Sequence, residues 1–257
     1  MLLAIDSGNT NIVFSVFDAA GAVLGEWRSS AANVRTADEF GVWLTQLMGL
    51  AGIDYKAIDA AIIATVVPAN LFDLKTLCSR YFGCQALVIG DPAVDLGIEV
   101  LVDNPEEVGA DRLVNAVGGH INYKGDLIVL DFGTATTFDV VDAGGNYRGG
   151  VIAPGINLSI EALHQAAAKL PRIAIRRPEK VIGTGTITAM QSGVFYGYVG
   201  MIEGMVARIK AEYNAPMTVI ATGGLAALFD EATKVIDAVE PHLTLFGLYA
   251  IYRRNTG

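Results

Sequence analysis

Residues 1–18, MLLAIDSGNTNIVFSVFD, and residues 127–142, LIVLDFGTATTFDVVD, carry the same pattern twice. In each copy an apolar strand ends at an aspartate, a short turn with glycine and threonine follows, and a second apolar strand ends at another aspartate. Apolar runs separated by a glycine-containing turn are typical of a β-hairpin. Each copy therefore predicts a hairpin with polar groups at its tip.

The spacing of the two copies indicates a duplicated fold. Aligning Asp6 with Asp131 brings Gly8 onto Gly133, and the closing aspartates of the two copies are then out of step by one residue. A hairpin loop that is one residue shorter keeps the same order of strands. We therefore predict two related α/β halves.

The remaining periodicity predicts strands alternating with helices. Further strands are expected at residues 22–28, 58–67, 86–89 and 217–222. Helices are expected at residues 37–51, 107–120, 181–210 and 241–252. The first of these helices begins with a capping box, in which the Thr36 side chain caps the helix and Glu39 completes the motif.

The composition is that of a packed globular chain. Of the 257 residues, 52% are hydrophobic and 18% are charged, which excludes a disordered protein and favours extensive burial, including at a subunit interface. The net charge of -9 argues against binding to nucleic acid or to an anionic membrane. No stretch of about 18 apolar residues occurs, so we expect a cytoplasmic protein without membrane spans. Cys78 and Cys84 lack metal-ligand spacing and are expected to be buried thiols.

The repeated turn has the chemistry of a phosphate site. Glycine lets the backbone approach a ligand, backbone N–H groups and a threonine hydroxyl can donate to phosphate oxygens, and the aspartate can hold the accompanying cation. A single copy would more often be an ordinary hairpin, because aspartate, asparagine and glycine are common turn residues. Two copies at equivalent positions favour two phosphate-binding hairpins that share one cleft.

Other phosphate-binding motifs do not explain the sequence. The chain contains no G-x-x-x-x-G-K-[ST] segment, and Gly183-Thr184-Gly185 lacks the third glycine and the preceding strand of a dinucleotide-binding loop. The sequence therefore argues against a P-loop or a Rossmann enzyme.

The duplicated hairpins resemble those of the actin, Hsp70 and sugar-kinase superfamily, and further stretches are similar to the type III pantothenate kinase family. These stretches span nearly the whole chain: residues 6–11 (DSGNTN), 27–28 (WR), 35–39 (RTADE), 104–112 (NPEEVGADR), 131–136 (DFGTAT), 149–155 (GGVIAPG), 189–193 (AMQSG) and 222–225 (TGGL). The resemblance implies duplicated ribonuclease H-like (actin-like ATPase) halves, each a mixed sheet flanked by helices. Residues 1–120 would carry the first phosphate hairpin and a catalytic aspartate. Residues 121–257 would carry the second hairpin and an adenosine-side glycine turn.

The same resemblance implies an activity and its ligands. It implies ATP-dependent phosphorylation of pantothenate to 4'-phosphopantothenate, the first step of coenzyme A biosynthesis, by a homodimer. Mg²⁺ would accompany ATP, and K⁺ or NH₄⁺ would be an essential monovalent cation. Two alternatives stay open: another small-molecule kinase of the same superfamily, and a non-catalytic nucleotide-binding regulator.

The matched motifs imply roles for single residues. Asp111 resembles the general base that accepts the proton of the pantothenate hydroxyl, and Arg112 would bind the pantothenate carboxylate. The implied pantothenate site comprises Gly109, Ala110, Asp111, Arg112 and Thr186. The implied ATP and phosphate site comprises Asp6, Ser7, Gly8, Asn9, Thr10, Asn11, Ile12, Val13 and Thr134. Asp131 would bind the monovalent cation, and Asp6 would lie on the Mg²⁺ side.

Two positions depart from the family pattern. Val102 stands where a tyrosine often lines the pantothenate pocket, and Gly185 stands where an asparagine usually precedes the threonine, so we expect an altered pocket. Two further interpretations stay open: Asp139 either supports the second hairpin or faces solvent, and Gly223-Gly224 either borders adenine or forms a plain turn. Outside this family pattern, Asp111-Arg112 would be interpreted as an ion pair at a helix start.

Overall fold

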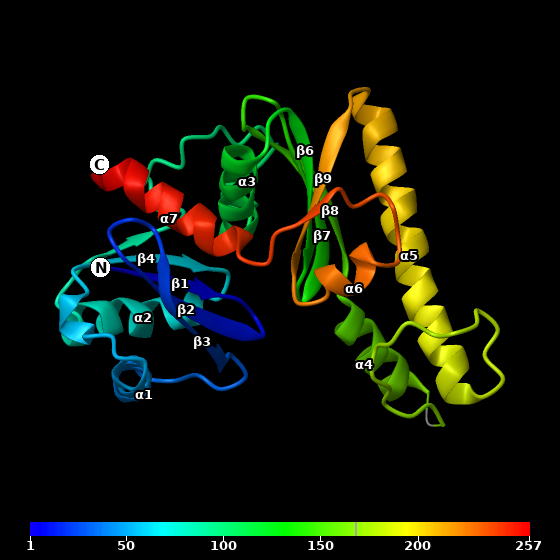
Figure 1. The fold of residues 1–257 in the computed structure, drawn as a ribbon, viewed down its shortest axis with the longest axis horizontal. Coiled ribbons are helices and arrows are strands. Elements are labelled where there is room, and N and C mark those ends of the chain that lie inside the picture. The colour runs from blue at the N-terminus through cyan, green and yellow to red at the C-terminus, as the bar shows by residue number, and fades with distance from the viewer. Residues whose placement is uncertain (168) are drawn as a thin grey trace. The chain divides into compact units, whose positions relative to one another are not determined.

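The computed structural model describes residues 1–167 and 169–257, which form two compact units. The first unit consists of Met1–Asn122 together with His242–Gly257, and the second consists of Tyr123–Pro241. Each unit contains a five-stranded sheet flanked by helices (Figure 1). Among the described residues, no helix has the length and apolar character needed to cross a membrane.

The first unit is built on a mixed sheet in the order β3-β2-β1-β4-β5. Its strands are β1 (Leu2–Ser7), β2 (Asn11–Phe17), β3 (Val23–Ser30), β4 (Ala60–Thr65) and β5 (Ala86–Val88). Its helices are α1 (Ala37–Leu50), α2 (Pro68–Tyr81), α3 (Ala110–Asn122) and α7 (Leu243–Thr256), with short 3-10 turns η1 (Tyr55–Ala57) and η2 (Pro105–Glu107). β1 pairs antiparallel with β2 and parallel with β4, so it occupies the centre of the sheet.

The second unit repeats this topology in the order β10-β9-β6-β7-β8. Its strands are β6 (Asp126–Phe132), β7 (Ala135–Val141), β8 (Tyr147–Pro154), β9 (Met217–Gly223) and β10 (Ala238–Val239). Its helices are α4 (Ile156–Ala166), α5 (Thr186–Tyr213) and α6 (Ala226–Asp230). β6 takes the place of β1, because it pairs antiparallel with β7 and parallel with β9.

The strand register confirms the duplication. Asp6 lies opposite Val13 in the first hairpin and Asp131 lies opposite Thr137 in the second, so the second loop is one residue shorter. The outer pair of each meander also shows a register shift at the equivalent position. The prediction of two related halves is therefore correct at the level of single strand pairs.

The outer turns of the two meanders are also built alike. The Asp18 carboxylate accepts backbone N–H bonds from the residues two and four positions later, and the Asp142 carboxylate does the same. Gly21 and Gly145 both have a φ of 88°, in the left-handed region that glycine adopts without strain. The aspartate that closes each copy of the sequence pattern is therefore a turn residue in both units.

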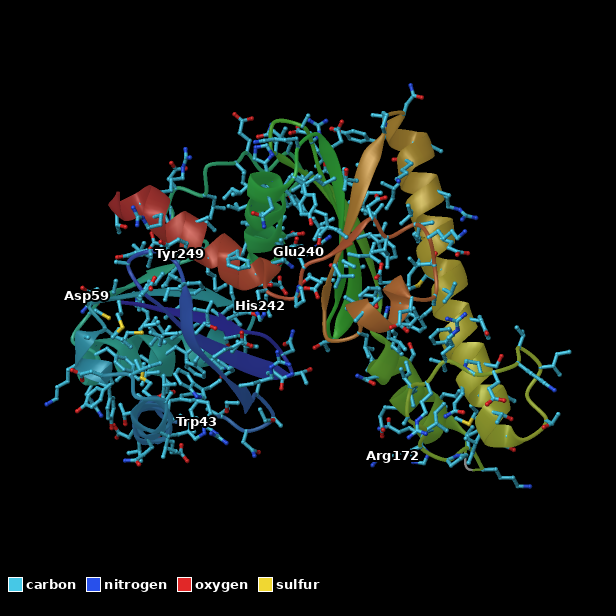
Figure 2. All side chains as sticks on the ribbon, viewed as in Figure 1. Trp43, Asp59, Arg172, Glu240, His242 and Tyr249 are labelled. Atoms are coloured by element: carbon cyan, nitrogen blue, oxygen red, sulfur yellow. The ribbon has the colours of Figure 1, made fainter. Side chains whose placement is uncertain are left out.

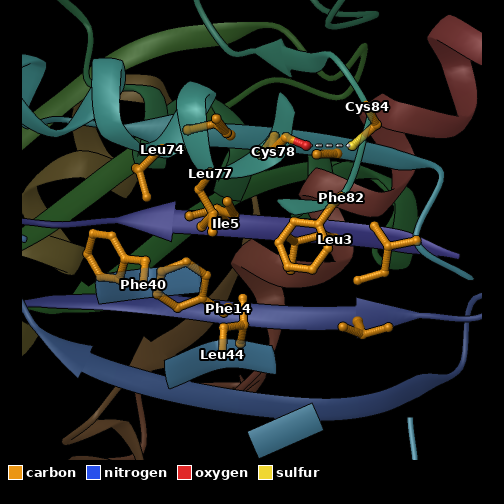
Figure 3. Close-up of a cluster of buried hydrophobic side chains, with 14 of the residues drawn as sticks. Leu3, Ile5, Phe14, Phe40, Leu44, Leu74, Leu77, Cys78, Phe82 and Cys84 are labelled. Atoms are coloured by element: carbon orange, nitrogen blue, oxygen red, sulfur yellow. Dashed lines mark hydrogen bonds between the residues drawn. The ribbon is translucent and has the colours of Figure 1, made fainter. Parts of the chain in front are cut away.

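Helices α1 and α2 cover one face of the first sheet. On that face Leu3 of β1 and Phe14 of β2 are fully buried (Figure 3). The rings of Phe14 and Phe40 have centroids 5.4 Å apart, which joins β2 to α1. α1 begins with the predicted capping box, because the Glu39 N–H donates to Thr36 Oγ1 and the Thr36 N–H donates to the Glu39 carboxylate.

Helices α3 and α7 cover the opposite face of the same sheet. Tyr249 of α7, labelled in Figure 2, stacks on Phe17 of β2, with ring centroids 5.1 Å apart. The family resemblance implies a second half that comprises residues 121–257, whereas α7 packs within the first unit. Glycine permits this packing, because a Cβ at Gly118 of α3 would lie 2.7 Å from the Leu243 carbonyl oxygen.

The long helix α5 begins later than the sequence pattern predicts. The pattern predicts helix from residue 181, but the helix starts at Thr186, with Gly185 extended as its N-cap. A Cβ at Gly183 would collide with the backbone of Ala189. The segment before α5 therefore folds back against the first turn of the helix and does not extend it.

Candidate functional site

The tip of the first hairpin is closed by its own backbone. The Gly8 N–H donates to the Asn11 carbonyl at 3.0 Å, and a Cβ at Gly8 would lie 3.3 Å from that same oxygen. The Thr10 carbonyl accepts the Ala31 N–H at 2.9 Å, which ties the tip to the end of β3. The side chains of Asn9 and Thr10 are exposed. The tip therefore presents polar side chains on a fixed backbone.

The other residues of the predicted phosphate site differ in what they can offer a ligand. Ser7 is fully buried, and its hydroxyl accepts a hydrogen bond from Asn70 Nδ2 at 3.2 Å. Ile12 is buried in the core, and Val13 is half-buried. Asp6, at the end of β1, is half-buried as well. Ser7 and Ile12 can therefore reach a phosphate only through their backbone, whereas Asp6 can offer its carboxylate.

Asp111 lies in the first turn of α3. This helix starts at Ala110, later than predicted, because Pro105–Glu107 forms the separate η2 turn. Asp111 Oδ1 accepts the Arg112 N–H at 2.8 Å. Burial nevertheless raises the pKa of the Asp111 carboxyl above its usual value, because desolvation disfavours the charged form more than this hydrogen bond favours it. Asp111 is therefore a stronger proton acceptor than an exposed aspartate.

Val66 and Gly109 connect Asp111 with the first hairpin. Val66 directly follows β4, and its N–H donates to the Ser7 carbonyl at 3.1 Å. A Cβ at Gly109 would lie 2.6 Å from Asp111 Oδ1 and 3.4 Å from the Val66 side chain. The ends of β1 and β4 and the start of α3 thus meet at one edge of the sheet. Ligands of open α/β sheets commonly bind at the carboxyl ends of such strands.

The tip of the second hairpin is fixed by β8 and the start of α4. The Gly133 N–H donates to the Ala135 carbonyl at 3.0 Å, and the Gly155 N–H donates to the Thr134 carbonyl at 3.1 Å. A Cβ at Gly155 would collide with the Thr134 carbonyl, so this position needs glycine. The Thr134 side chain is exposed. Like the first tip, the second presents a threonine on a fixed backbone.

Asp131 lies against Gly223 on the neighbouring strand. Asp131 of β6 is opposite Thr222 of β9 in the parallel pair. Gly223 has a φ of 89°, and a Cβ there would lie 2.6 Å from Asp131 Oδ1. Both the backbone conformation and the neighbouring carboxylate therefore require glycine. A Cβ at Gly224, by contrast, would meet no described atom within 4 Å.

Thr186 lies on a different element from these hairpins. It is the first residue of α5, and its side chain is exposed. The Gly185 N–H donates to Thr188 Oγ1 at 3.1 Å, which caps the start of the helix. Val102, the other position that departs from the family pattern, is half-buried. The place of Thr186 in a pantothenate site stays a prediction.

The carboxylates suit cations that take most of their ligands from a nucleotide or from water. Within residues 1–167 and 169–257, no three His, Cys, Asp or Glu side chains gather into a metal cage. Mg²⁺ in nucleotide sites needs only one or two protein carboxylates, because phosphates and waters complete its shell. Asp6 beside the first tip fits this requirement. Asp131, half-buried against the Gly223 backbone, offers an oxygen ligand of the kind that K⁺ accepts.

Sequence reasoning missed the residues that support the two hairpins. Asn70 holds the Ser7 side chain, and Val66 joins Ser7 to Gly109. The sequence carries one signal for Asn70, a polar residue placed directly after a long apolar run. Asp139 is fully buried, so the alternative in which it faces solvent is wrong.

Comparison with known proteins identifies similar sequences along the whole chain. Residues 2–208 match the sequence model of a family described as type III pantothenate kinase. A protein of Paramagnetospirillum magneticum that is named type III pantothenate kinase is 67% identical over 256 residues. This similarity covers 100% of the present chain and 98% of that protein.

Solved structures with a similar fold are more distant in sequence. A Campylobacter jejuni protein proposed to be a Baf family transcriptional activator superposes with a TM-score of 0.63 at 17% identity, covering 98% of both chains. A Sinorhizobium meliloti protein proposed to be a 2-dehydro-3-deoxygalactonokinase superposes with a TM-score of 0.61 at 12% identity, covering 99% of both chains. At such identities the likeness shows the fold alone, and it confirms the expected class of duplicated ribonuclease H-like halves.

Proposed function

The chain belongs to the type III pantothenate kinase family and phosphorylates pantothenate with ATP, and from this premise we propose that Asp111 is its general base. The observation that carries the proposal is the position of Gly109, two residues before Asp111, close to Val66, whose backbone N–H donates to the Ser7 carbonyl of the first hairpin. The raised pKa of Asp111 supports the same role, because a more basic carboxylate accepts a proton more readily.

The transfer is a single displacement at the γ-phosphorus of ATP. Asp111 accepts the proton of the pantothenate hydroxyl as the hydroxyl oxygen attacks. The new bond joins that oxygen to the γ-phosphorus, the bond from the γ-phosphorus to the β,γ-bridging oxygen breaks, and ADP leaves with the bridging electrons. Because this chemistry needs little covalent help from the protein, positioning and charge neutralisation supply most of the acceleration.

The first hairpin is proposed to bind the phosphates of ATP. Asn9 and Thr10 supply exposed polar side chains, and the half-buried Asp6 supplies a carboxylate on the Mg²⁺ side. Bound Mg²⁺ would neutralise part of the phosphate charge. The remaining members of this proposed site are Ser7, Gly8, Asn11, Ile12 and Val13, of which Ser7 and Ile12 act through their backbone.

The second hairpin is proposed to contribute Thr134 as a phosphate contact and Asp131 as a ligand of K⁺ or NH₄⁺. The exposed hydroxyl of Thr134 on a fixed tip supports the first assignment. The half-buried carboxylate of Asp131, held against Gly223, supports the second. A bound monovalent cation would supply positive charge to offset the negative charge of the phosphates.

The pantothenate site is proposed to contain Gly109, Ala110, Arg112 and Thr186. Arg112 directly follows Asp111, so base and guanidinium share one turn of α3. The guanidinium fork matches the geometry of a carboxylate. Val102 and Gly185 remove a hydroxyl and an amide found in the family pattern, so the rest of the substrate meets different contacts.

A homodimer that works in the cytoplasm is the proposed form of the enzyme. The second unit leaves several large apolar side chains exposed: Ile152, Leu158, Leu163, Val181, Ile182 and Ile187. Where such side chains lie together on the surface, they mark a protein interface. The free thiols of Cys78 and Cys84 (Figure 3) agree with a reducing compartment.

The test is turnover of pantothenate by purified protein with ATP and Mg²⁺, in the wild type and in Asp111→Asn. Asparagine keeps the size of the side chain and can accept the Arg112 N–H, but it cannot take up the hydroxyl proton. We expect kcat to fall at least about 100-fold, with the unfolding temperature retained. Asp95→Asn is the matched control, because Asp95 is 63% exposed and pairs with Arg254; its turnover should be unchanged.

Each other outcome has a distinct meaning. Full turnover in Asp111→Asn would refute the assignment of the base. Turnover of another hydroxyl compound, but not of pantothenate, would indicate a different kinase of the superfamily. ATP binding without turnover of any substrate would indicate a regulator.

A further inference from the structure

The second hairpin carries a buried polar group next to the proposed cation ligand. Asp139 of β7 is fully buried, and its carboxylate accepts hydrogen bonds from Thr137 Oγ1 at 3.0 Å and from the Tyr147 hydroxyl at 2.9 Å. Tyr147 is 1% exposed, whereas Thr137 is half-buried. A buried carboxylate is costly unless it is hydrogen-bonded, so these hydroxyls stabilise it. We call Thr137, Asp139 and Tyr147 the Asp139 group.

The first unit serves as an internal comparison, because it has the same strands without this group. The strand register places Val13, Ser15 and Val23 at the positions of Thr137, Asp139 and Tyr147. Ser15 is fully buried as well, and among the described residues its hydroxyl has no hydrogen-bond partner. A requirement of the shared fold would apply to both units. The Asp139 group therefore serves a task of the second unit alone.

The Asp139 group reaches the candidate cation site through Thr137. Thr137 lies directly opposite Asp131 on the neighbouring antiparallel strand. Residues in this relation have side chains on the same face of the sheet, with Cβ atoms about 5 Å apart. Thr137 and Asp131 are both half-buried, while Asp139 and Tyr147 are closed to solvent. Thr137 is therefore the accessible member of the group beside Asp131.

The hydrogen bond to Asp139 fixes what the Thr137 hydroxyl can bind. A hydroxyl has one proton to donate and lone pairs with which to accept. Since the proton of Thr137 points at Asp139 Oδ2, the oxygen presents lone pairs on its other sides. An oxygen that presents lone pairs can bind a cation, whereas binding a phosphate oxygen would require the hydroxyl to donate a hydrogen bond to it. The arrangement thus suits a cation next to Asp131.

We propose that Asp139 is a positioning residue which, together with Tyr147, holds the Thr137 oxygen as a ligand for a monovalent cation beside Asp131. Tyr147 donates to Oδ1 and so orients the carboxylate with Oδ2 toward Thr137. This inference rests on the proposed function, in which Asp131 binds K⁺ or NH₄⁺.

The experiment measures K⁺ binding and K⁺ activation separately. Binding is followed as the shift of the unfolding temperature with KCl, compared with tetramethylammonium chloride at equal ionic strength, because a ligand of the native state raises that temperature without any turnover. Activation is followed as the K⁺ concentration at half-maximal turnover. The variants are Thr137→Val, Thr137→Ser and Asp139→Asn, and the matched control is Ser15→Ala at the equivalent position of the first unit.

The expected results distinguish a role of Asp139 in positioning the Thr137 oxygen from a role in stability alone. Two K⁺ midpoints are compared: the K⁺ concentration at half of the maximal temperature shift and the K⁺ concentration at half-maximal turnover. Thr137→Val should raise both about tenfold, a common cost of disturbing the surroundings of a metal ligand. Thr137→Ser should restore them, because serine keeps the oxygen. Asp139→Asn should raise them as well, because the asparagine amide donates to Thr137 and turns its proton toward the cation. Ser15→Ala should leave both midpoints unchanged.

Two outcomes would overturn the inference. Unchanged K⁺ midpoints in Thr137→Val and Asp139→Asn, with a lower unfolding temperature, would make the group purely structural. A wild type that shows no K⁺-specific shift of the unfolding temperature would exclude the cation, even if pantothenate is phosphorylated.

If K⁺ binding depends on Thr137 but pantothenate is not phosphorylated, the proposed function fails and the inference stands. If Asp139→Asn does not fold, the pair Thr137→Val and Thr137→Ser decides.

Discussion

Asp111 and Asp139 are two carboxylates that differ in how far each is buried, and this difference decides what each can do. Asp111 is half-buried in the first turn of α3, so its pKa is raised while a substrate can still reach it. Asp139 is fully buried and accepts hydrogen bonds from the hydroxyls of Thr137 and Tyr147. In the roles proposed above, the first carboxylate takes up a proton and the second orients a neighbouring hydroxyl.

The raised pKa of Asp111 predicts an acid limit to catalysis. If Asp111 is the base, it must be ionised, so kcat/KM falls as the pH drops through its folded-state pKa, which lies above the usual aspartate value of about 3.9. The same sign means that ionised Asp111 opposes folding above that pH and that its protonation relieves the cost. Asp111→Asn should therefore be at least as stable as the wild type at neutral pH.

The measurement is the pH profile of kcat/KM, made with pantothenate and with an analogue that lacks the substrate carboxylate. The analogue is the control, because the titration of the substrate's own acid is then absent. A midpoint at or below the usual aspartate value with the analogue would contradict the assignment of the acid limit to Asp111.

At the scale of elements, the site depends on glycines where one element ends and another begins. Gly109 lies against Asp111 before α3, Gly155 lies against the Thr134 carbonyl before α4, and Gly223 lies against Asp131 at the end of β9. A side chain at any of these positions would move the polar group beside it. The geometry of the functional groups is therefore set by the ends of the elements.

Gly223→Ala should destabilise the protein, and Gly224→Ala should not. Alanine at 223 would have to adopt a φ of 89° with its Cβ 2.6 Å from Asp131 Oδ1, so we expect a loss of about 1–3 kcal/mol in the free energy of unfolding. Gly224→Ala is the matched control, because its Cβ meets no described atom within 4 Å; its effect should stay within about 0.5 kcal/mol. Urea unfolding measures both values, and equal stabilities would contradict the argument.

The elements that depend on local sequence were predictable. The capping box of α1 was predictable because Thr36 and Glu39 bond to each other across one turn. The start of α5 was not, because the contact of Gly183 with Ala189 arises from the path of a loop. The burial of Asp139 was not predictable either, because a strand covered on both faces loses the alternation that tells one face from the other.

The motifs of the proposed site could be named from the sequence, whereas the residues that support them could not. The hairpin tips and Asp111 lie in motifs that resemble a known family, so they could be named from the sequence. Asn70 reaches Ser7 across 63 residues of chain; its place after an apolar run marks it as unusual, but no local pattern names its partner. The pairing of Tyr147 with Asp139 became visible only when the strand register was known.

At the scale of the whole molecule, one topology is used twice with different local chemistry. The sheets β3-β2-β1-β4-β5 and β8-β7-β6-β9-β10 have equivalent strand orders. Asp6 and Asp131 occupy equivalent positions, yet a threonine faces the second and a valine the first. The duplication therefore supplies two sheets of the same topology, and different residues at equivalent strand positions give each sheet its own local chemistry.

The proposed homodimer predicts a native mass of twice the 27.1 kDa of the chain, measured by light scattering. Ile182→Asp combined with Ile187→Asp should yield monomers, because both side chains are exposed and apolar in the second unit and a carboxylate is costly to bury at an interface. Leu50→Asp is the matched control, because Leu50 is 85% exposed at the end of α1 in the first unit. A monomeric wild type, or dissociation by Leu50→Asp instead, would contradict the proposal.

The position of α7 also has a consequence for synthesis on the ribosome. The second unit is one continuous stretch, Tyr123–Pro241, whereas the first unit needs both Met1–Asn122 and His242–Gly257. A nascent chain emerges from its N-terminus at about 5–20 residues per second, so the second unit is fully available before α7 appears. The unit that is translated first is therefore completed last. Until then the apolar face that α7 will cover is open to solvent.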